Sequence, residues 1–258
     1  MHCFRYTFHA FLLFMLPLMA SAQKAEESAP QVTDSTLKIT AQKGMCILEN
    51  FAISKKIDID YQKVEEYVTQ YAEGYEQLMN RFQEDPNSLN DEEAAMLYYG
   101  FAFTKDYEPK NVDMNVGLMK EFQNKNFFAY QKELKRTPVS LSLLMNAAYL
   151  ANEMGNKVLE QRYRQKATKL LNAIMASGTG YSKESAIKVL YIADEYAIFR
   201  DMMGLRMTMQ DFIDHRYDRM TLETGNGGES IILWFDTYLS FLNHEKNISN
   251  HKKTNNKK

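Results

Sequence analysis

Residues 170–205 read LLNAIMASGTGYSKESAIKVLYIADEYAIFRDMMGL, and the apolar periodicity of the chain changes within them. Before this stretch apolar residues recur at three- and four-residue steps, which is typical of amphipathic helices. After Ser177-Gly178-Thr179-Gly180, the run Ile187–Ile192 is rich in β-branched and aromatic residues, which favours a strand. The stretch is therefore predicted to be a helix–loop–strand junction, with Gly178 ending the helix in a left-handed cap.

The segment before this junction is predicted to be all-helical. Helices are expected over 60–82 with a bend at Gly74, and over 91–103 after a capping box formed by Asn90 and Glu93. Further helices are expected near 113–123, 126–136, 139–154 and 157–176. The helices near 126–136, 139–154 and 157–176, separated by Pro138 and by Gly155-Asn156, have the sequence pattern of degenerate tetratricopeptide hairpins. They amount to about one and a half units, too few for an independent solenoid, which needs about three.

The segment after the junction is predicted to be a small antiparallel sheet. Asp194 is placed to cap a short helix over 195–203, closed by Gly204. Strands are expected at 206–213, 217–223 and 231–235, separated by Asp214-His215-Arg216 and by a glycine-rich loop at 225–228, with a final helical turn over 238–242. Short connections favour antiparallel neighbours. The predicted fold class is α+β, with helical hairpins packed on the sheet.

The predicted domain organisation places one α+β domain at 57–242, with a helical part at 57–177 and a sheet part at 178–242. Residues 1–22 carry an apolar run and then Ala20-Ser21-Ala22, which is the pattern of a secretory signal peptide cleaved after Ala22. Residues 23–56 are predicted to be a linker, and 243–258, with five lysines and one glutamate, a disordered basic tail. No cysteine follows the cleavage point directly, so no lipid anchor is expected.

These features predict a periplasmic or secreted protein without a transmembrane anchor. The apolar run of the signal is too short for a membrane helix, which needs about 20 residues. The net charge of −2 gives no general attraction to nucleic acid. Beyond the signal the chain holds one cysteine, Cys46, so no intramolecular disulfide can form, and pairing with a second chain stays open.

Three stretches resemble the family known as domain of unknown function 4919, a family of secreted bacterial proteins. They are YEQLMNRFQEDPNSLNDEEAAMLYYGFAFTKDYEP at 75–109, AIMASGTGYSKESAIKVLYIADEYAIFRDMMGL at 173–205 and, more loosely, 214–238. The chain departs from the family pattern at Thr179, where aspartate is more usual, and at Ala193, where serine is common. The resemblance implies architecture and export, and it supplies no catalytic residues.

Candidate functional residues are few. The glycines and Lys183 of SGTGYSKES lack the spacing of a nucleotide loop, so a helix stop and a turn capped by Ser182 are predicted instead. Asp211, Asp214, His215 and Asp218 could bind a metal, but alternation on a hairpin separates them, and a solvated turn is preferred. No metal site and no cofactor is predicted.

Two hypotheses for function remain open from the sequence. The first is a non-enzymatic interaction protein that presents a groove or aromatic patch to a protein or peptide partner in the cell envelope. The helical spacing of the aromatic residues at 98–107 favours a place in the core, and Tyr99 and Tyr107 are the members expected to reach solvent if the cluster is exposed. The alternative is a hydrolase that uses carboxylates such as Asp194 and Glu195 in a cleft at the helix–sheet junction. No nucleophile elbow, metalloprotease helix or dinucleotide fingerprint is present, and the first hypothesis is preferred.

Overall fold

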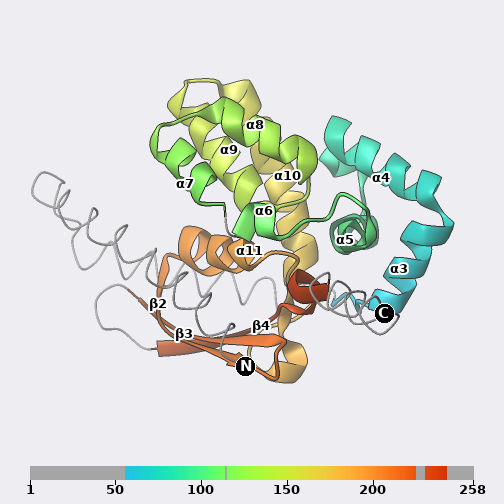
Figure 1. The fold of residues 1–258 in the computed structure, drawn as a ribbon, viewed down its shortest axis with the longest axis vertical. Helices are drawn as coiled ribbons and strands as arrows, with labels where there is room; N and C mark the ends of the chain where they lie inside the picture. Colours follow the sequence, from blue (N-terminus) through green and yellow to red (C-terminus); the bar gives the residue numbers. More distant parts are fainter. Residues whose placement is uncertain (1–55, 114, 225–229, 243–258) are drawn as a thin grey trace, which may run out of the picture.

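The computed structural model describes residues 56–113, 115–224 and 230–242 (Figure 1). The predicted signal peptide at 1–22, the linker up to residue 55 with Cys46, the loop at 225–228 and the basic tail at 243–258 lie outside the described residues. Within the described part the fold is α+β, with helices first and a small sheet at the end, as predicted.

The helical part follows the predicted order, and its helices lie within a few residues of their expected positions, except for the short α6, which was not predicted. Its helices are α3 (Tyr61–Gln70), α4 (Ala72–Glu84), α5 (Asp91–Gly100), α6 (Lys110–Asp113), α7 (Val116–Gln123), α8 (Phe127–Arg136), α9 (Leu141–Glu153) and α10 (Lys157–Met175), with 3₁₀ turns η1 (Pro86–Ser88) and η2 (Phe101–Phe103) on either side of α5. The bend expected at Gly74 is a break at Tyr71 instead, where φ is −123° and ψ is 51°.

Side-chain caps explain where these helices begin. Asn90 and Glu93 form the predicted capping box, in which each side chain accepts a hydrogen bond from the other residue's backbone N–H. Asn115, Asn126, Ser140 and Asn156 cap α7, α8, α9 and α10 without the reciprocal bond, each side chain accepting from the backbone N–H of the third residue of its helix. Tight helix–turn–helix connections therefore place α7 to α10 side by side (Figure 1).

The sheet has four strands in the order β1-β4-β3-β2. They are β1 (Ile187–Lys188), β2 (Leu205–Ile213), β3 (Tyr217–Thr224) and β4 (Ser230–Asp236). β2, β3 and β4 are antiparallel neighbours, whereas β1 pairs with β4 in parallel. The prediction of an entirely antiparallel sheet is therefore wrong, because the chain leaves β1 through helices and returns to it only with β4.

Between β1 and β2 the chain is mostly helical. The strand predicted over Ile187–Ile192 lasts for two residues only, and α11 (Ile192–Tyr196) continues into a π-helical segment, η4 (Ala197–Met202). Gly204 closes this segment with φ of 67°, as predicted. Figure 1 shows α11 between the sheet and the bundle of α7–α10, and it thus joins the two parts.

The junction needs its glycines, though for different reasons than expected. Gly178 is not left-handed; the positive φ of 75° belongs to Gly180. A Cβ at Gly178 would lie 2.5 Å from Ser185 O and closer still to Ala186 O, so the backbone can pass only without a side chain. Ser182 caps the 3₁₀ turn η3 (Lys183–Ser185), and Gly180 O accepts from Trp234 N at 2.8 Å. The loop is thereby fastened to β4.

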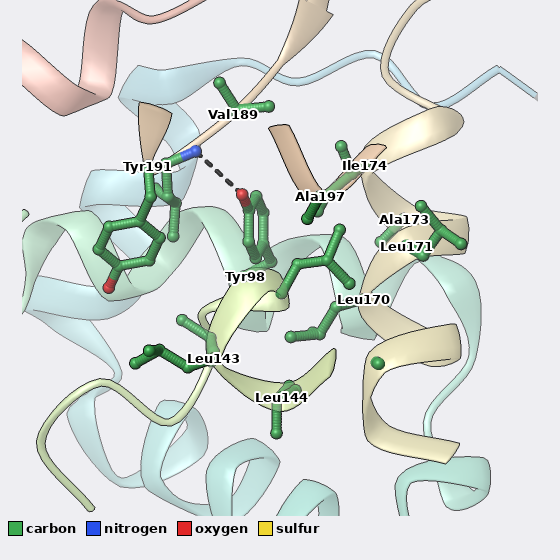
Figure 2. Close-up of a cluster of buried hydrophobic side chains, with 14 of the residues drawn as sticks. Tyr98, Leu143, Leu144, Leu170, Leu171, Ala173, Ile174, Val189, Tyr191 and Ala197 are labelled. Atoms are coloured by element: carbon green, nitrogen blue, oxygen red, sulfur yellow. Dashed lines mark hydrogen bonds between the residues drawn. The ribbon is translucent and has the colours of Figure 1, made fainter. Parts of the chain in front are cut away.

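The helical part and the sheet part share one interior. Buried apolar residues from α3 to the helical turn at 238–242 form a single cluster. Tyr98 of α5 lies among leucines of α9 and α10 and beside the chain leaving β1, and its hydroxyl accepts from Leu190 N at 3.0 Å (Figure 2). In the part of the chain that the structure describes, no helix combines the length and the apolar character needed to cross a membrane.

Candidate functional site

Tyr99 and Tyr107 do not reach solvent, so their expected exposure is wrong, and the preferred prediction that the aromatic cluster belongs to the core is confirmed for both residues. Tyr99 is 0% and Tyr107 1% exposed. The Tyr99 hydroxyl donates to Lys188 O at 3.0 Å, and the Tyr107 hydroxyl donates to Leu190 O at 2.6 Å. The two hydroxyls thus satisfy one backbone carbonyl at the end of β1 and one just after it, and the two rings present no surface to a partner.

Asp194 is fully buried at the meeting point of α5, α9 and α11. Its carboxylate accepts from the Tyr98 hydroxyl at 2.7 Å, from Ser142 N at 2.9 Å and from the Ser140 hydroxyl at 3.4 Å. Ser140 and Ser142 begin α9, so Asp194 caps α9 from a distant part of the chain. The prediction that it caps its own helix is wrong, since it lies inside α11 and makes no such bond.

The charge state of Asp194 follows from two opposed effects. Burial raises the pKa of its carboxyl to about 6, and the hydrogen bonds from α9 and Tyr98 partly offset that rise. At neutral pH the ionised form interacts favourably with the N-terminus of α9. Each oxygen is already engaged by a structural donor, so the group's evident role is to hold α9 against α11.

Glu195 points to a different neighbour, Asp218 of β3. Both side chains are buried, with 0% and 1% exposure. Burial raises the pKa of Asp218 to about 6, while hydrogen bonding with Gln210 and Glu195 lowers it somewhat. Gln210 in turn accepts from the Tyr196 hydroxyl at 3.4 Å. The result is a polar network between α11 and the sheet, built around a buried pair of acidic side chains.

The hydrolase alternative therefore finds no accessible carboxylate pair at Asp194 and Glu195. Both are 0% exposed, and neither lines a cavity wall described below. Acid–base catalysis requires each carboxyl to approach the bond that is cleaved. Asp194 and Glu195 therefore cannot serve as the catalytic carboxylates that the hydrolase alternative requires.

The four candidate metal ligands at the β2–β3 hairpin do not converge on one point. Asp214 and His215 take positive φ values of 53° and 54° and form the turn between β2 and β3. Asp214 pairs with Lys183, Asp211 lies 3.6 Å from Arg219, and Asp218 is buried as described. Within 56–113, 115–224 and 230–242, no three His, Cys, Asp or Glu side chains gather in an arrangement that could hold a metal ion.

A groove of about 800 Å³ lies between the helical bundle and the α11–η4 segment. We call it the α9 groove, because α9 forms its floor with Ser142, Met145, Asn146 and Tyr149. These four residues follow helical i, i+3, i+4, i+7 spacing and so occupy one face of α9. The walls come from the following residues of other elements: Leu118, Met119 and Phe122 of α7, Arg164, Ala167 and Thr168 of α10, and Ala193, Tyr196, Arg200, Asp201 and Met202 of α11 and η4.

Aromatic and thioether side chains give the α9 groove its apolar surface. Tyr149 is 47% exposed, and its ring lies 5.6 Å from that of Phe122, centroid to centroid. Met119, Met145 and Met202 are half-buried around it. Flexible thioethers adapt to irregular apolar partners, and exposed aromatic rings supply large contact areas. The groove thus has the surface of a site that binds an apolar group.

Polar groups at the α9 groove carry a small excess of positive charge. Arg164 and Arg200 line it together with one acid, Asp201. Arg200 forms two hydrogen bonds with Asp201, of 2.6 and 3.1 Å, whereas Arg164 donates to Glu160, which is not part of the wall. Asn146 and Gln123 add amide groups. These groups suit a ligand that combines apolar side chains with backbone amides and an acidic group.

The α9 groove could not be recognised in the sequence because its residues come from seven elements, spread from α6 to η4. One signal was available: α9, LSLLMNAAYLANE, carries apolar residues on both faces. A helix of that kind is either enclosed on all sides or exposes an apolar face for another purpose. Met145 and Tyr149 belong to the face of α9 that the other described residues leave partly uncovered.

Comparison with known proteins yields one match. The sequence model of a family described as domain of unknown function (DUF4919) matches residues 62–246, which is more than half of the chain. No curated protein and no solved structure matches.

Proposed function

We propose that this chain, which belongs to the DUF4919 family, is an exported interaction protein that binds a partner at the α9 groove. The partner we infer is a short apolar peptide segment that carries an acidic side chain. The observation that carries this proposal is the groove itself, about 800 Å³ in volume, with an apolar and aromatic floor and an excess of arginine in its walls.

The apolar floor argues for a side-chain ligand. Peptide-binding grooves commonly place large apolar anchors in a hollow between helices, where water is excluded around them. The ring pair of Tyr149 and Phe122 and the thioether of Met145 provide such a hollow. An acidic residue of the same peptide would meet Arg164 or Arg200. The groove should therefore bind apolar peptides with a negative charge more tightly than apolar peptides with a positive charge.

Export is the second half of the proposal, and residues 1–22 support it by their sequence pattern. The mature protein is expected to begin at Gln23. N-terminal sequencing of the protein from a periplasmic or secreted fraction checks this, and recovery of the intact leader in the cytoplasm would contradict it.

Binding at the α9 groove is testable with two peptide libraries of equal apolar content, one acidic and one basic. We expect acidic peptides to be enriched on the wild-type protein. Truncation of an aromatic anchor typically costs more than about 1 kcal/mol, so Tyr149→Ala should weaken the selected peptides by about fivefold or more. Met145→Arg should abolish their binding by filling the groove with a long charged side chain.

The matched control is Val158→Arg, which alters an exposed apolar residue of α10 that does not line the α9 groove. It should leave peptide affinity unchanged. Equal enrichment of both libraries, or peptides whose affinity is the same for wild type and Met145→Arg, would refute binding at this groove.

A further inference from the structure

A second cavity lies on the other side of α10, between α4, α8 and α10, and has a volume of about 470 Å³. We call it the Lys166 cavity. Figure 1 shows α4 standing beside α10, with α8 nearby. Met79 of α4, Leu134 of α8 and Leu159 of α10 supply its apolar wall. This cavity shares no lining residue with the α9 groove.

Its charged wall residues are all cationic. Lys135 comes from α8, and Arg162 and Lys166 come from successive turns of α10. The wall residues of α4 are Met79 and Gln83, so α4 contributes no charge. No aspartate or glutamate is among the described residues that line the cavity. Three positive side chains around an acid-free hollow create a positive potential in it.

Lys166 is the unusual member of this set because it is only 4% exposed. Its Nζ donates to Gln83 Oε1 and lies 5.5 Å from the centroid of the Phe82 ring. No carboxylate of the described residues lies within ion-pair distance of it. Lysine is rarely buried without a counter-ion, because desolvation of an unpaired ammonium is costly. A buried ammonium at a cavity wall therefore points to an anionic partner.

Arg162 adds a second group that can bind an anion. Its Nη2 donates to Gln83 O at 2.9 Å, at the C-terminal end of α4. This bond occupies one of the five N–H groups of a guanidinium. The contacts of Arg162 and Lys166 with Gln83 help to hold the end of α4, but they leave donors on both side chains for a ligand in the cavity.

We propose that the Lys166 cavity binds a small amphiphilic anion, whose carboxylate or phosphate group meets Lys166 and Arg162 and whose apolar body lies against Met79, Leu134 and Leu159. The inference is independent of the α9 groove, since the two cavities have separate walls. Charge-assisted hydrogen bonds in a partly dry site fix the headgroup, and the apolar wall selects against bare inorganic ions.

The protonation of Lys166 gives the proposal a second signature. Burial, together with the positive charge of Arg162, lowers the pKa of Lys166 to about 8. The ammonium that the anion needs therefore predominates at neutral pH and is lost as the pH rises past that value. Bound anion would stabilise the charged form and raise the pKa, so affinity should fall between about pH 7 and pH 9.5.

Calorimetric titration of the full chain with octanoate, octyl phosphate, octan-1-ol, octylamine and inorganic phosphate tests the site. We expect octanoate and octyl phosphate to bind at pH 7, each at least about tenfold more tightly than octanol or octylamine, as a charge-assisted bond implies. Inorganic phosphate should bind more weakly than octyl phosphate. Octanol binding as tightly as octanoate, or no binding of either octyl anion, would overturn the proposal.

Variants place the binding at Lys166. Lys166→Met keeps the length of the side chain without its charge and should weaken both octyl anions by at least about tenfold. Lys169→Met is the matched control, because Lys169 lies on the same helix, is half-buried and donates to a backbone carbonyl, Leu89 O, but does not line the cavity. Its affinities should match those of the wild type.

A further variant keeps the test valid if Lys166→Met does not fold. Arg162→Gln alters an exposed residue of the same wall and should reduce the affinity for both octyl anions severalfold. Octyl anions that bind these two wall variants as tightly as the wild type, or whose affinity does not change between pH 7 and pH 9.5, would show that they bind elsewhere.

Discussion

Tyr98 connects three parts of the chain through one hydroxyl group. It donates to Asp194 Oδ2 at 2.7 Å and accepts from Leu190 N at 3.0 Å, and its ring is fully buried. Asp194 in turn caps α9. A residue of α5 therefore stabilises the start of α9, the chain after β1 and α11 together, and its effect on stability should exceed that of an ordinary buried hydroxyl.

Tyr98→Phe tests this role. The change leaves a carboxylate oxygen and a backbone N–H without the hydroxyl, at about 1–3 kcal/mol for each group, so we expect a loss of about 2–6 kcal/mol in the free energy of unfolding. Tyr75→Phe is the control, since the Tyr75 hydroxyl makes one bond, to Leu97 O, and should cost about 0.5–1.5 kcal/mol. Equal losses in urea denaturation would contradict the account.

Asp218 should make the stability depend on pH. Its pKa is raised from 3.8 to about 6 in the folded chain, so the fold favours the protonated carboxyl. That contribution is fully present below about pH 4 and is lost as the pH rises through 6, with a limit of about 3 kcal/mol for a shift of about two units. Asp194, which is shifted in the same direction, adds to the fall.

Asp218→Asn removes the contribution of Asp218 to this pH dependence and leaves that of Asp194. We expect the fall in unfolding free energy between about pH 4 and pH 7 to be smaller than in the wild type, by an amount up to about 3 kcal/mol. Urea denaturation at several pH values measures it. An unchanged slope would mean that Asp218 is ionised throughout that range.

At the level of elements, the junction loop depends on a close approach of backbones. Gly178→Ala would press a Cβ against the carbonyl oxygens of Ser185 and Ala186, and neither can move without shifting the chain into β1. We expect a loss of more than about 2 kcal/mol. Gly117→Ala is the control, because its Cβ would meet only the Asn115 side chain, at 3.3 Å, and alanine favours helix by about 1 kcal/mol. Thermal unfolding that ranks the two variants equally would argue against this role of Gly178.

The helices could be predicted from the sequence, and the middle of the sheet part could not. From Tyr61 to Met175 the apolar spacing and the caps agree, so local signals suffice. The run Ile187–Ile192 is apolar except for Lys188 and is largely buried, and a short apolar run does not distinguish a strand from a buried helix. The parallel pairing of β1 with β4 depends on residues nearly fifty positions apart, which no local pattern encodes.

The candidate site was harder to predict than the fold. Tyr99 and Tyr107 are aromatic residues of the kind found at binding sites, but their hydroxyl groups donate to the backbone carbonyls of Lys188 and Leu190 inside the core. Asp194 and Glu195 are adjacent in sequence and turn to opposite partners, α9 and β3. The α9 groove and the Lys166 cavity depend on how the helices pack, and their residues become neighbours only in the folded chain.

At the scale of the whole molecule, neither part closes its own core. The helices α8, α9 and α10 leave apolar faces that α5 and α11 cover, and the sheet buries one face against the same interior. Ile57 N donates to Ala176 O at 2.8 Å, so even the start of the described chain is joined to the end of α10. We expect the two parts to unfold as one unit, as small domains with a shared core do.

Equilibrium unfolding in urea, followed by two signals at once, tests this shared interior most directly. Trp234, the only tryptophan, lies in β4 and reports on the sheet by fluorescence, while far-ultraviolet circular dichroism reports mainly on the helices. We predict a single transition with the same midpoint and slope for both signals. Two separate transitions, with the helices persisting after Trp234 is exposed, would contradict a common core.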